Sequence, residues 1–489
     1  MTVDTPDDDY IAALPKWRKV RNCLSGSDAV RAAGRDYLPA LTGQSLSEYD
    51  AYKMRAGFYE ATGRTREALS GLVFSRPSVI NGGSSALNEL LPDIDAAGTD
   101  VDHFAMHLVE EALATGRGLI VVNHNGDPTL QTSADVANGR PYLRFYAAET
   151  IVSWKVGVID GSAQLTRVVL KECIDEQDPD DEFGEIDVEQ YRVLDIDEAG
   201  KYRQRVFRQP ANGSDWEQFG LSVYPVVNGR NWTLLPVSLI SLGRGAELCP
   251  GPIPLLPLAE LNLSHWRTSA DLEHGAHFTG LPTPIISGVK LAPNETIRIG
   301  SAEALVFEEP GAKAEYLEFK GEGLGVLERL LSRKEAHMAA LGARLLAPEK
   351  AGVESGDALQ IRRTGETASL MRIAQSVSIA ITKALGFMEE WLGGAPDVGY
   401  ELNKVYASEM IDARTVDALV KAWQGGAISF ETLFYNLQRG GRIEDQSTVA
   451  DEQERIANGP QQPALVPPAL VPPAPPAPAN NNNPQPIVA

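Results

Sequence analysis

The chain has 489 residues, of which 43% are hydrophobic, so it is too long for one compact core and can form two to four subdomains. Its formal net charge is −22, which argues against a tight DNA binder because such binding requires clustered Lys and Arg. Its longest apolar runs, such as 255–261, fall far short of the ~20 residues that cross a bilayer, and its acidic N-terminus is unlike a signal peptide.

The N-terminal part is predicted to be helical with loops between the helices. One helix presents a single face of residues at three- and four-residue steps, namely Tyr49, Tyr52, Ala56 and Tyr59. Ser45 or Ser47 is available as its N-cap, and Gly63 is expected to be its C-cap. A second helix is predicted over 65–73, and Pro77 forces an extended exit.

The middle of the chain changes from helix to strand. We predict a helix over 101–115, a buried strand over 118–122, and a predominantly β region over 141–240. Five strands in that region are rich in β-branched and aromatic residues: 142–146, 151–156, 165–173, 190–196 and 202–207. An acidic segment, 175–187, interrupts this sheet; a solvated hairpin tip is the simplest interpretation, and a divalent-cation site is the alternative.

Two long helices with a small β region between them follow. Pro252, Pro254 and Pro257 open an apolar helix that is predicted to run to about Ala276. Four short strands are expected at 283–287, 296–299, 304–308 and 314–319. The next helix, 322–345, has a narrow heptad-like seam suited to packing on a neighbouring helix. The apolar seam residues are Leu324, Leu327, Leu331, Met338, Leu341 and Leu345, with Lys334 at the missing step.

A loop at 346–357 leads into a long helix over 358–392. Its buried face is predicted to contain Leu370, Ile373, Val377, Ile381, Ala384 and Met388. A strand at 400–405 and small helices follow, one of them within 425–443 and one capped by Asp412. The proline-rich tail, 460–489, cannot form a packed core and is expected to be mobile and polyproline-II-like.

No catalytic constellation emerges from the sequence. His103 and His107 have zinc-site spacing, but Phe104 stands where a zincin needs glutamate, so a structural helix face is the simpler interpretation. His274 and His277 are expected to cap a helix end. The Gly-rich segment 321–325 lacks the Lys and hydroxyl residue of a phosphate-binding loop. Three scattered cysteines without CxxC spacing predict reduced thiols. Because the sequence also lacks a GxSxG motif and a complete phosphate-binding loop, we expect no metal, no cofactor and no enzyme.

One segment carries a family resemblance. Tyr-Leu-Pro at 37–39 is followed by Ser-Glu-Tyr-x-x-Tyr-x-x-Arg-Ala at 47–56, Phe-Tyr at 58–59, and Thr-Gly-Arg-Thr at 62–65 that leads to Pro77. This order and spacing resembles an uncharacterised tailed-bacteriophage family that is grouped with the portal, or head-to-tail connector, proteins. The segments 425–443 and 451–456 also resemble its C-terminal part, and the element order over 252–392 is similar to that of portal proteins.

The resemblance implies an α+β portal-type fold with a β-rich wing, a two-helix stem, a small β clip, a long wing helix and a helical C-terminal region. The implied divisions are the wing 1–251, stem helices 252–276 and 322–345, clip 277–321, tunnel loop 346–357, long wing helix and strand 358–406, crown 407–459 and tail 460–489. Arg344, Glu349, Lys350 and Glu354 would then line a DNA channel. An ordinary solvated loop is the alternative for these four residues.

The implied function is a ring, a dodecamer if it follows the family, at one capsid vertex of a virion assembled in the host cytoplasm. Viral double-stranded DNA would pass through it, and its partners would be the terminase motor, the capsid protein and head–tail adaptor or tail proteins, with no membrane. An acidic channel wall suits DNA that must slide, although solubility alone also explains the charge. The alternative is a prophage-encoded, metal-dependent cytoplasmic enzyme that uses the helix 103–111 or the acidic segment.

Overall fold

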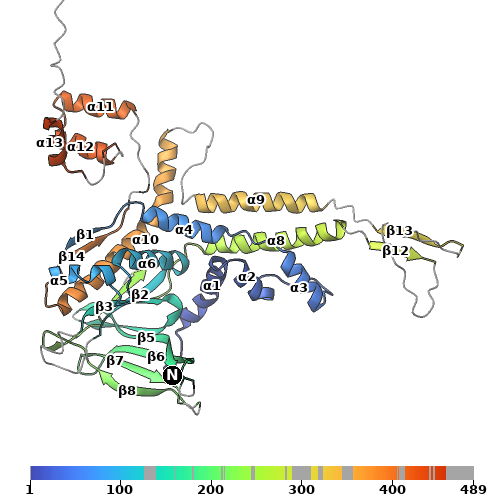
Figure 1. Cartoon of the computed structure of the whole chain (residues 1–489), viewed down its shortest axis with the longest axis horizontal. Helices are drawn as coiled ribbons and strands as arrows, with labels where there is room; N and C mark the ends of the chain where they lie inside the picture. Colours follow the sequence, from blue (N-terminus) through green and yellow to red (C-terminus); the bar gives the residue numbers. More distant parts are fainter. Residues whose placement is uncertain are drawn as a thin grey trace, which may run out of the picture. The chain divides into compact units, whose positions relative to one another are not determined.

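The computed structural model divides the chain into two compact units, Met1–Tyr406 and Ala407–Ala489, which are described separately below. Helices and antiparallel sheets are combined in the first unit, so the coarse α+β class is confirmed (Figure 1). The described residues are 2–125, 139–159, 161–178, 181–210, 213, 215–243, 248–280, 283–288, 310–317, 323–343, 356–404, 406, 413–439, 442–443 and 447–458. The predicted strands 296–299 and 304–308, Asp412 as a helix cap and the tail 460–489 lie outside them.

Four helices form the N-terminal part: α1 (Asp8–Leu24), α2 (Ser27–Ala33), α3 (Leu46–Arg55) and α4 (Ala61–Val73). Ser45 caps α3 as predicted, in a reciprocal capping box in which its hydroxyl accepts from the main-chain N–H of Glu48. The carboxylate of Glu48 in turn accepts from the main-chain N–H of Ser45 at 2.8 Å.

The predicted C-terminal end of α3, with Gly63 as its cap, is wrong. The backbone turns to an extended conformation at Ala56, so Gly63 lies in the first turn of α4 and does not cap α3. Tyr49, Tyr52 and Ala56 are buried, but Tyr59 lies beyond the helix and is 45% exposed. The three- and four-residue period therefore describes a real buried face that stops one step earlier than predicted.

A three-stranded antiparallel sheet with the order β11–β2–β3 lies against α6 (Val101–Thr115). Its strands are β2 (Arg117–His124), β3 (Pro141–Ala147) and β11 (Val237–Ser241). The predicted helix and buried strand are both confirmed. Asp100 caps α6, and Gly116 ends it in the left-handed region at φ 77°. A β-carbon at Gly116 would lie 2.3 Å from the carbonyl oxygen of Pro252, so only glycine fits there.

Five further strands form a meander in the order β4–β5–β6–β7–β8. They are β4 (Ile151–Ile159), β5 (Ser162–Gln177), β6 (Glu185–Ile196), β7 (Tyr202–Arg208) and β8 (Glu217–Val223). The pairing of β5 with β6 continues into the acidic segment 175–187, where Asp175 faces Asp187. This segment is therefore the far end of a long hairpin, with a short turn at its tip.

The long helix α10 (Gly356–Trp391) packs on β2, β11 and α6. Its predicted buried face is confirmed, because each of the six residues is at most 2% exposed: Leu370, Ile373, Val377, Ile381, Ala384 and Met388. The following strand, β14 (Val398–Glu401), begins earlier than the predicted 400–405 and pairs with β1 (Val79–Gly82). Short elements complete the unit: α5 (Ser85–Asn88), β9 (Val226–Val227) and β10 (Arg230–Asn231).

A fully buried cation joins α1 to both sheets. The guanidinium of Arg117 lies 5.0 Å from the ring centre of Trp17 and 4.7 Å from that of Trp154. It donates to the carbonyl oxygens of Leu248 and Ile151, each at 2.6 Å. Burial lowers the pKa of Arg117 to about 10, since no carboxylate among the described residues bonds to it.

The second unit contains α11 (Ala413–Gln424), α12 (Phe430–Arg439) and α13 (Val449–Asn458). Its buried residues include Leu433 and Phe434 of α12, and the ring of Phe430 lies 5.9 Å from that of Trp423. None of the described helices, in either unit, is long and apolar enough to cross a membrane.

Candidate functional site

Two long helices, α8 (Leu256–Gly280) and α9 (Leu324–Ala343), lie side by side and antiparallel (Figure 1). At ~1.5 Å per residue they span roughly 37 Å and 30 Å. The predicted bounds 252–276 are corrected, because α8 begins at Leu256 and continues to Gly280. Pro254 disfavours a helical conformation at the residue before it, while Pro257 lies in the first turn, where proline is tolerated.

Three contacts fix the register of α9 against α8. A β-carbon at Gly275 would lie 2.7 Å from Cδ2 of Leu324, so the helices approach closely at this end. In the middle, Nζ of Lys334 donates to the carbonyl oxygen of Ser264 at 2.8 Å. Nearby, Nε2 of His265 lies 3.2 Å from Oε1 of Glu335. A glycine, a lysine and a histidine–glutamate contact thus position α9 against α8, together with the leucines of the seam.

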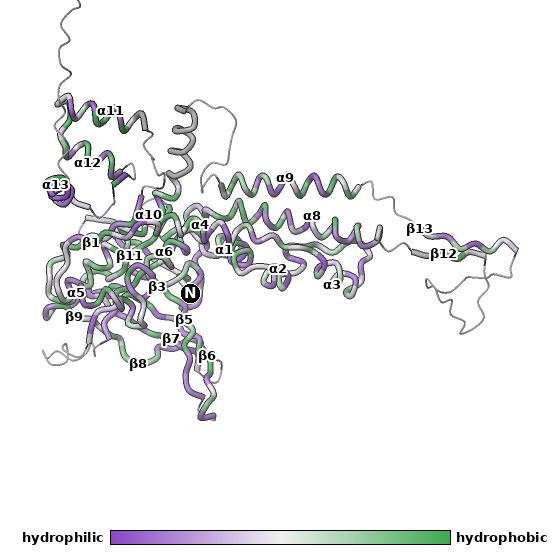
Figure 2. The backbone as a smooth tube through the Cα atoms, turned by 45° about the horizontal axis from the view of Figure 1, so that its top comes forward, coloured by the Kyte–Doolittle hydropathy of each residue, from purple (hydrophilic) through white to green (hydrophobic). Residues whose placement is uncertain are grey.

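The apolar seam residues of α9 lie on the side that faces α8. Met338 is buried at 2% exposure, and four others are half-buried: Leu324, Leu327, Leu331 and Leu341. Lys334 occupies the remaining step and bonds to α8. The hydropathy colours alternate along both helices, as expected where only one face of each helix is apolar (Figure 2).

Part of the surface of α9 outside the seam is open in the single chain. Val326 is 48% exposed and Leu330 is 40% exposed, and Arg329 and Arg333 are exposed on the same helix. A helix of this length that packs only along a narrow seam leaves a broad face available for a further contact.

The segment 35–77, which carries the family resemblance, contacts α8 along its length and forms a cradle for this helix. The hydroxyl of Tyr52 donates to Oδ1 of Asp271 at 2.6 Å, and burial raises the pKa of Tyr52. The buried amide of Asn262 accepts from the main-chain N–H and hydroxyl of Thr62, at 3.2 and 2.9 Å. The same amide donates to the carbonyl oxygen of Tyr59 at 2.6 Å. Motif residues therefore satisfy polar groups that α8 buries.

Further contacts extend this cradle to both ends of the pair. Oγ of Ser269 accepts from the main-chain N–H of Gly57 at 3.2 Å. A β-carbon at Gly342 of α9 would lie 2.9 Å from Oγ1 of Thr65, so α9 passes close to α4. Sequence reasoning missed these partners. The sequence offers no clear signal for them, because α8 contains many other polar residues besides Asn262 and Ser269.

The remaining predicted site residues are placed in part. The region 277–321, which is predicted to be a clip, contains an antiparallel pair, β12 (Thr283–Ser287) and β13 (Lys313–Leu317). Arg344, Glu349, Lys350 and Glu354 lie outside the described residues, which stop at 343 and resume at 356.

The residues weighed for chemistry have structural partners. Nδ1 of His103 lies 2.6 Å from Oδ2 of Asp100, the cap of α6. Both carboxylate oxygens of Glu111 accept from Nη2 of Arg21, at 2.8 and 2.7 Å, within the core next to α1. Across the described ranges, no group of three His, Cys, Asp or Glu side chains is arranged to hold a metal ion.

His277 lies in the last turn of α8 as predicted, whereas His274 lies further from the end, because the helix extends to Gly280. The ring of His274 makes an edge contact with Tyr52 at 5.2 Å between centres. Nε2 of His277 lies 3.2 Å from the guanidinium of Arg55. Both imidazoles thus contact α3.

Comparison with known proteins gives one family match. Residues 254–392, from α8 through the clip and α9 to the end of α10, match a family described as a domain of unknown function, DUF4055. No curated protein matches this chain.

Three solved structures of gene transfer agent (GTA) particles are similar at low identity. The neck of the empty particle, with C6 symmetry, has a TM-score of 0.37 and 14% identity over 82% of this chain and 96% of that chain. The virion of the native particle has a TM-score of 0.38 and 13% identity over 84% of this chain and 97% of that chain. The neck of the native particle, with C12 symmetry, has a TM-score of 0.36 and 14% identity over 83% of this chain and 98% of that chain. Such values do not by themselves establish a shared fold.

Proposed function

We propose that this chain is the subunit of a portal ring at one vertex of a bacteriophage capsid, where it forms the conduit for packaging and ejection of viral DNA. The observation that carries the proposal is the order of elements from α8 to α10. Two antiparallel helices enclose a β hairpin and precede a long helix, and the motif segment 35–77 forms the cradle of the first. This is the stem, clip and wing order that the sequence resemblance implies.

The helix pair suits assembly into a ring. Each α9 uses its seam for α8 of the same chain and leaves Val326 and Leu330 partly exposed beside that seam. A surface that contacts a different surface on the next copy produces head-to-tail interfaces, which close into a ring when the rotation allows. The resemblance implies twelve copies.

The tunnel loop supplies the proposed DNA contact. Lys350 is the loop's only cation and lies between Glu349 and Glu354 in the sequence, with Arg344 just before the loop. One lysine beside two carboxylates gives weak attraction to phosphate, and weak contacts suit a duplex that must keep moving. The four residues would thus line the narrowest part of the channel.

The packaging motor is expected to be a partner protein, because this sequence lacks an ATP-binding loop. Its sequence contains no phosphate-binding loop with the Lys and hydroxyl residue that hold ATP and Mg²⁺. The packaging motor, a terminase, would therefore be a separate protein that docks on the ring. Capsid protein and head–tail adaptor or tail proteins would contact its outer and lower surfaces in the virion. We propose a structural role without catalysis.

The test is the mass and shape of the purified full-length chain. At −22 per chain, subunits repel one another at low ionic strength, so assembly should strengthen with added salt or divalent cations. Light scattering and electron microscopy of particles prepared across that range should reveal closed rings of uniform subunit number. A monomer at every salt concentration would rule out the portal assignment.

A further inference from the structure

A two-stranded arm extends beyond the five-stranded sheet. The pairing of β4 with β5 ends at Leu170, and β7 pairs with β6 only from Gln190 onward. Beyond Glu172, which faces Gln190, the β5–β6 ladder continues to Gln177 and Glu185, and no other strand of the described residues pairs with it. The five residues 173–177 make this arm ~17 Å long at ~3.3 Å per residue. Hairpins without neighbouring strands are marginally stable in water, so such an arm gains from a partner surface.

The arm presents an aromatic side chain at its tip. Phe183 is 90% exposed, the highest exposure among the large hydrophobic residues of the described chain. The amide of Gln177 donates to the carbonyl oxygens of Asp181, Glu182 and Gly184 at 2.9, 2.8 and 3.1 Å. The tip thus has a defined turn, which holds Phe183 outward amid carboxylates (Figure 2, where the tip is hydrophilic).

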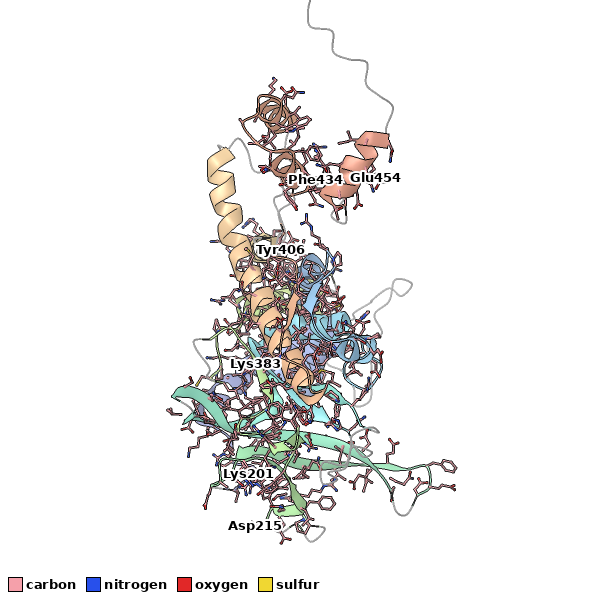
Figure 3. All side chains as sticks on the ribbon, turned by 90° about the vertical axis from the view of Figure 1, so that its left-hand side faces the viewer. Lys201, Asp215, Lys383, Tyr406, Phe434 and Glu454 are labelled. Carbon is pink, nitrogen blue, oxygen red and sulfur yellow. The ribbon has the colours of Figure 1, made fainter. Side chains whose placement is uncertain are left out.

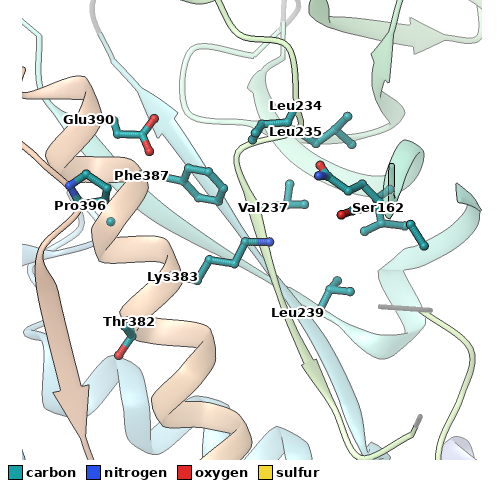
Figure 4. A pocket seen from close by; sticks show the side chains of 14 residues that line it. Ser162, Leu234, Leu235, Val237, Leu239, Thr382, Lys383, Phe387, Glu390 and Pro396 are labelled. Carbon is teal, nitrogen blue, oxygen red and sulfur yellow. The ribbon is translucent and has the colours of Figure 1, made fainter. Parts of the chain in front are cut away.

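A pocket of about 510 Å³ opens between α10, β11 and the turn from β4 to β5. Its walls are largely apolar and include Leu234, Leu235, Phe387 and Pro396. A cavity of about 150 Å³ accommodates benzene, so the side chain of a phenylalanine fits this space. In Figure 4 the amine of Lys383 points from α10 across the pocket toward β11.

The charges of tip and pocket complement each other. Within the described residues Lys383 has no ion-pair partner. Its amine lies 5.5 Å from the ring centre of Phe387, and burial lowers the pKa of Lys383. No basic side chain of the described residues pairs with Glu182 or Glu185 near the tip. Glu390 also lines the pocket and opposes an acidic ligand, but it lies two helical turns from Lys383, ~10 Å along the axis.

The arm cannot reach the pocket of its own chain. Ser162, the first residue of β5, lines the pocket, and Gln177, the last, supports the tip. Sixteen strand residues separate the two features, roughly 50 Å at ~3.3 Å per residue. In Figure 3 the hairpin extends away from the part of α10 that carries Lys383.

We infer that the β5–β6 arm of one subunit docks in the pocket of the next copy of this chain, with Phe183 between its apolar walls and the carboxylate of Glu182 or Glu185 near Lys383. This inference rests on the proposed ring. Two different surfaces at opposite ends of one strand form a head-to-tail contact, the kind from which a ring closes. The arm would link neighbouring wings independently of the stem helices.

Cross-linking of full-length chains tests the contact directly. Phe183→Cys and Ala163→Cys, the latter at the pocket, are made in separate chains in which Cys173 and Cys249 are replaced by Ser, leaving only buried Cys23. Under mild oxidation with oxidised glutathione, a disulfide-linked dimer should form in the mixture and in neither chain alone. Absence of that dimer, while rings still form, would overturn the arm contact and leave the portal proposal intact.

Dimers without closed rings would support the arm contact and overturn the ring. A cross-link that appears only after deletion of 460–489 would show that the tail fills the pocket, and would overturn the inference. As a second measurement, Phe183→Ser and Lys383→Glu should each raise the concentration for half-assembly about tenfold, as for interface hot spots. Adding Glu182→Lys should partly reverse the Lys383→Glu loss. Leu221→Ser, which changes an 88% exposed residue of β8, is the matched control and should assemble normally.

Discussion

Lys334 of α9 donates to the carbonyl oxygen of Ser264 in α8 at 2.8 Å and to Oγ1 of Thr268 at 2.5 Å. A cation thus fills the step of the seam that would otherwise hold a leucine. Burial, aided by the positive charge of Arg267, lowers the pKa of Lys334. A single polar residue on an apolar seam specifies the register of two helices at some cost in stability.

We predict that Lys334→Met and Lys334→Glu have clearly different effects on the free energy of unfolding. Met keeps the aliphatic contact, so the free energy of unfolding should change by less than about 1 kcal/mol. Glu cannot donate to Ser264 or Thr268 and should cost about 2 kcal/mol. Urea unfolding followed by circular dichroism measures both. A Lys334→Glu variant as stable as the parent protein would contradict this prediction.

Met338→Asp should destabilise the helix pair strongly. Its side chain is 2% exposed, and a carboxylate buried there without a partner costs several kcal/mol unless it is protonated. Leu331→Asp, at a half-buried seam position, should act in the same direction and also abolish rings. Leu330→Asp is the control, because Leu330 is 40% exposed and its replacement should leave unfolding unchanged. Loss of assembly in a stable Leu330→Asp variant would identify the open face of α9 as a contact between subunits.

Arg117→Lys should lower the free energy of unfolding substantially, although it keeps the positive charge. Lysine lacks the planar group that lies between Trp17 and Trp154 and donates to several carbonyl oxygens, so a charge would remain buried with fewer partners. We expect a loss of about 3 kcal/mol in the free energy of unfolding. A thermal shift indistinguishable from that of the parent protein would contradict this role.

Removal of the tail after Gly459 should leave folding and assembly unchanged. The sequence 460–489 is uncharged and proline-rich and has no amphipathic period, so it can add little to a packed core. Melting temperature and particle mass of the truncated chain provide the measurement. A large decrease in either would indicate that the tail is bound to the rest of the protein.

Lys350→Ala should separate assembly from DNA handling. Rings should form normally, because the change removes one loop cation per subunit, whereas packaging or retention of DNA should change. Equilibrium binding of free DNA fragments should alter little, since binding by one lysine beside two glutamates is weak from the start. A map of the ring with Lys350 on its outer surface would refute the channel role without refuting the ring.

Local signals in the sequence predicted the helices well. The bounds of α6 follow from Asp100 as N-cap and Gly116 as left-handed C-cap, both of which act within one turn. The buried face of α10 follows from its 3.6-residue period. Local rules failed at Gly63, where the turn at Ala56 ended α3 before the glycine was reached.

The contacts that organise the candidate site depend on residues far apart in the chain. Asn262 is explained only by Thr62 and Tyr59, which lie about two hundred residues earlier. Likewise, nothing near Lys383 in the sequence indicates a pocket, because its walls come from β11 and the β4–β5 turn. Periodicity identifies which face of an element is buried but does not identify what covers it.

The pairing of β1 with β14 has a consequence for biosynthesis. Val79 and Glu401 meet in a strand pair although more than three hundred residues separate them. At translation rates of about 5–20 residues per second, β1 waits roughly 15–65 s for its partner. A chain that stops before β14 leaves an open strand edge at β1. Only polypeptides that extend past Glu401 can therefore close this sheet, so products truncated before that residue would be excluded from assembly before they could be built into a particle.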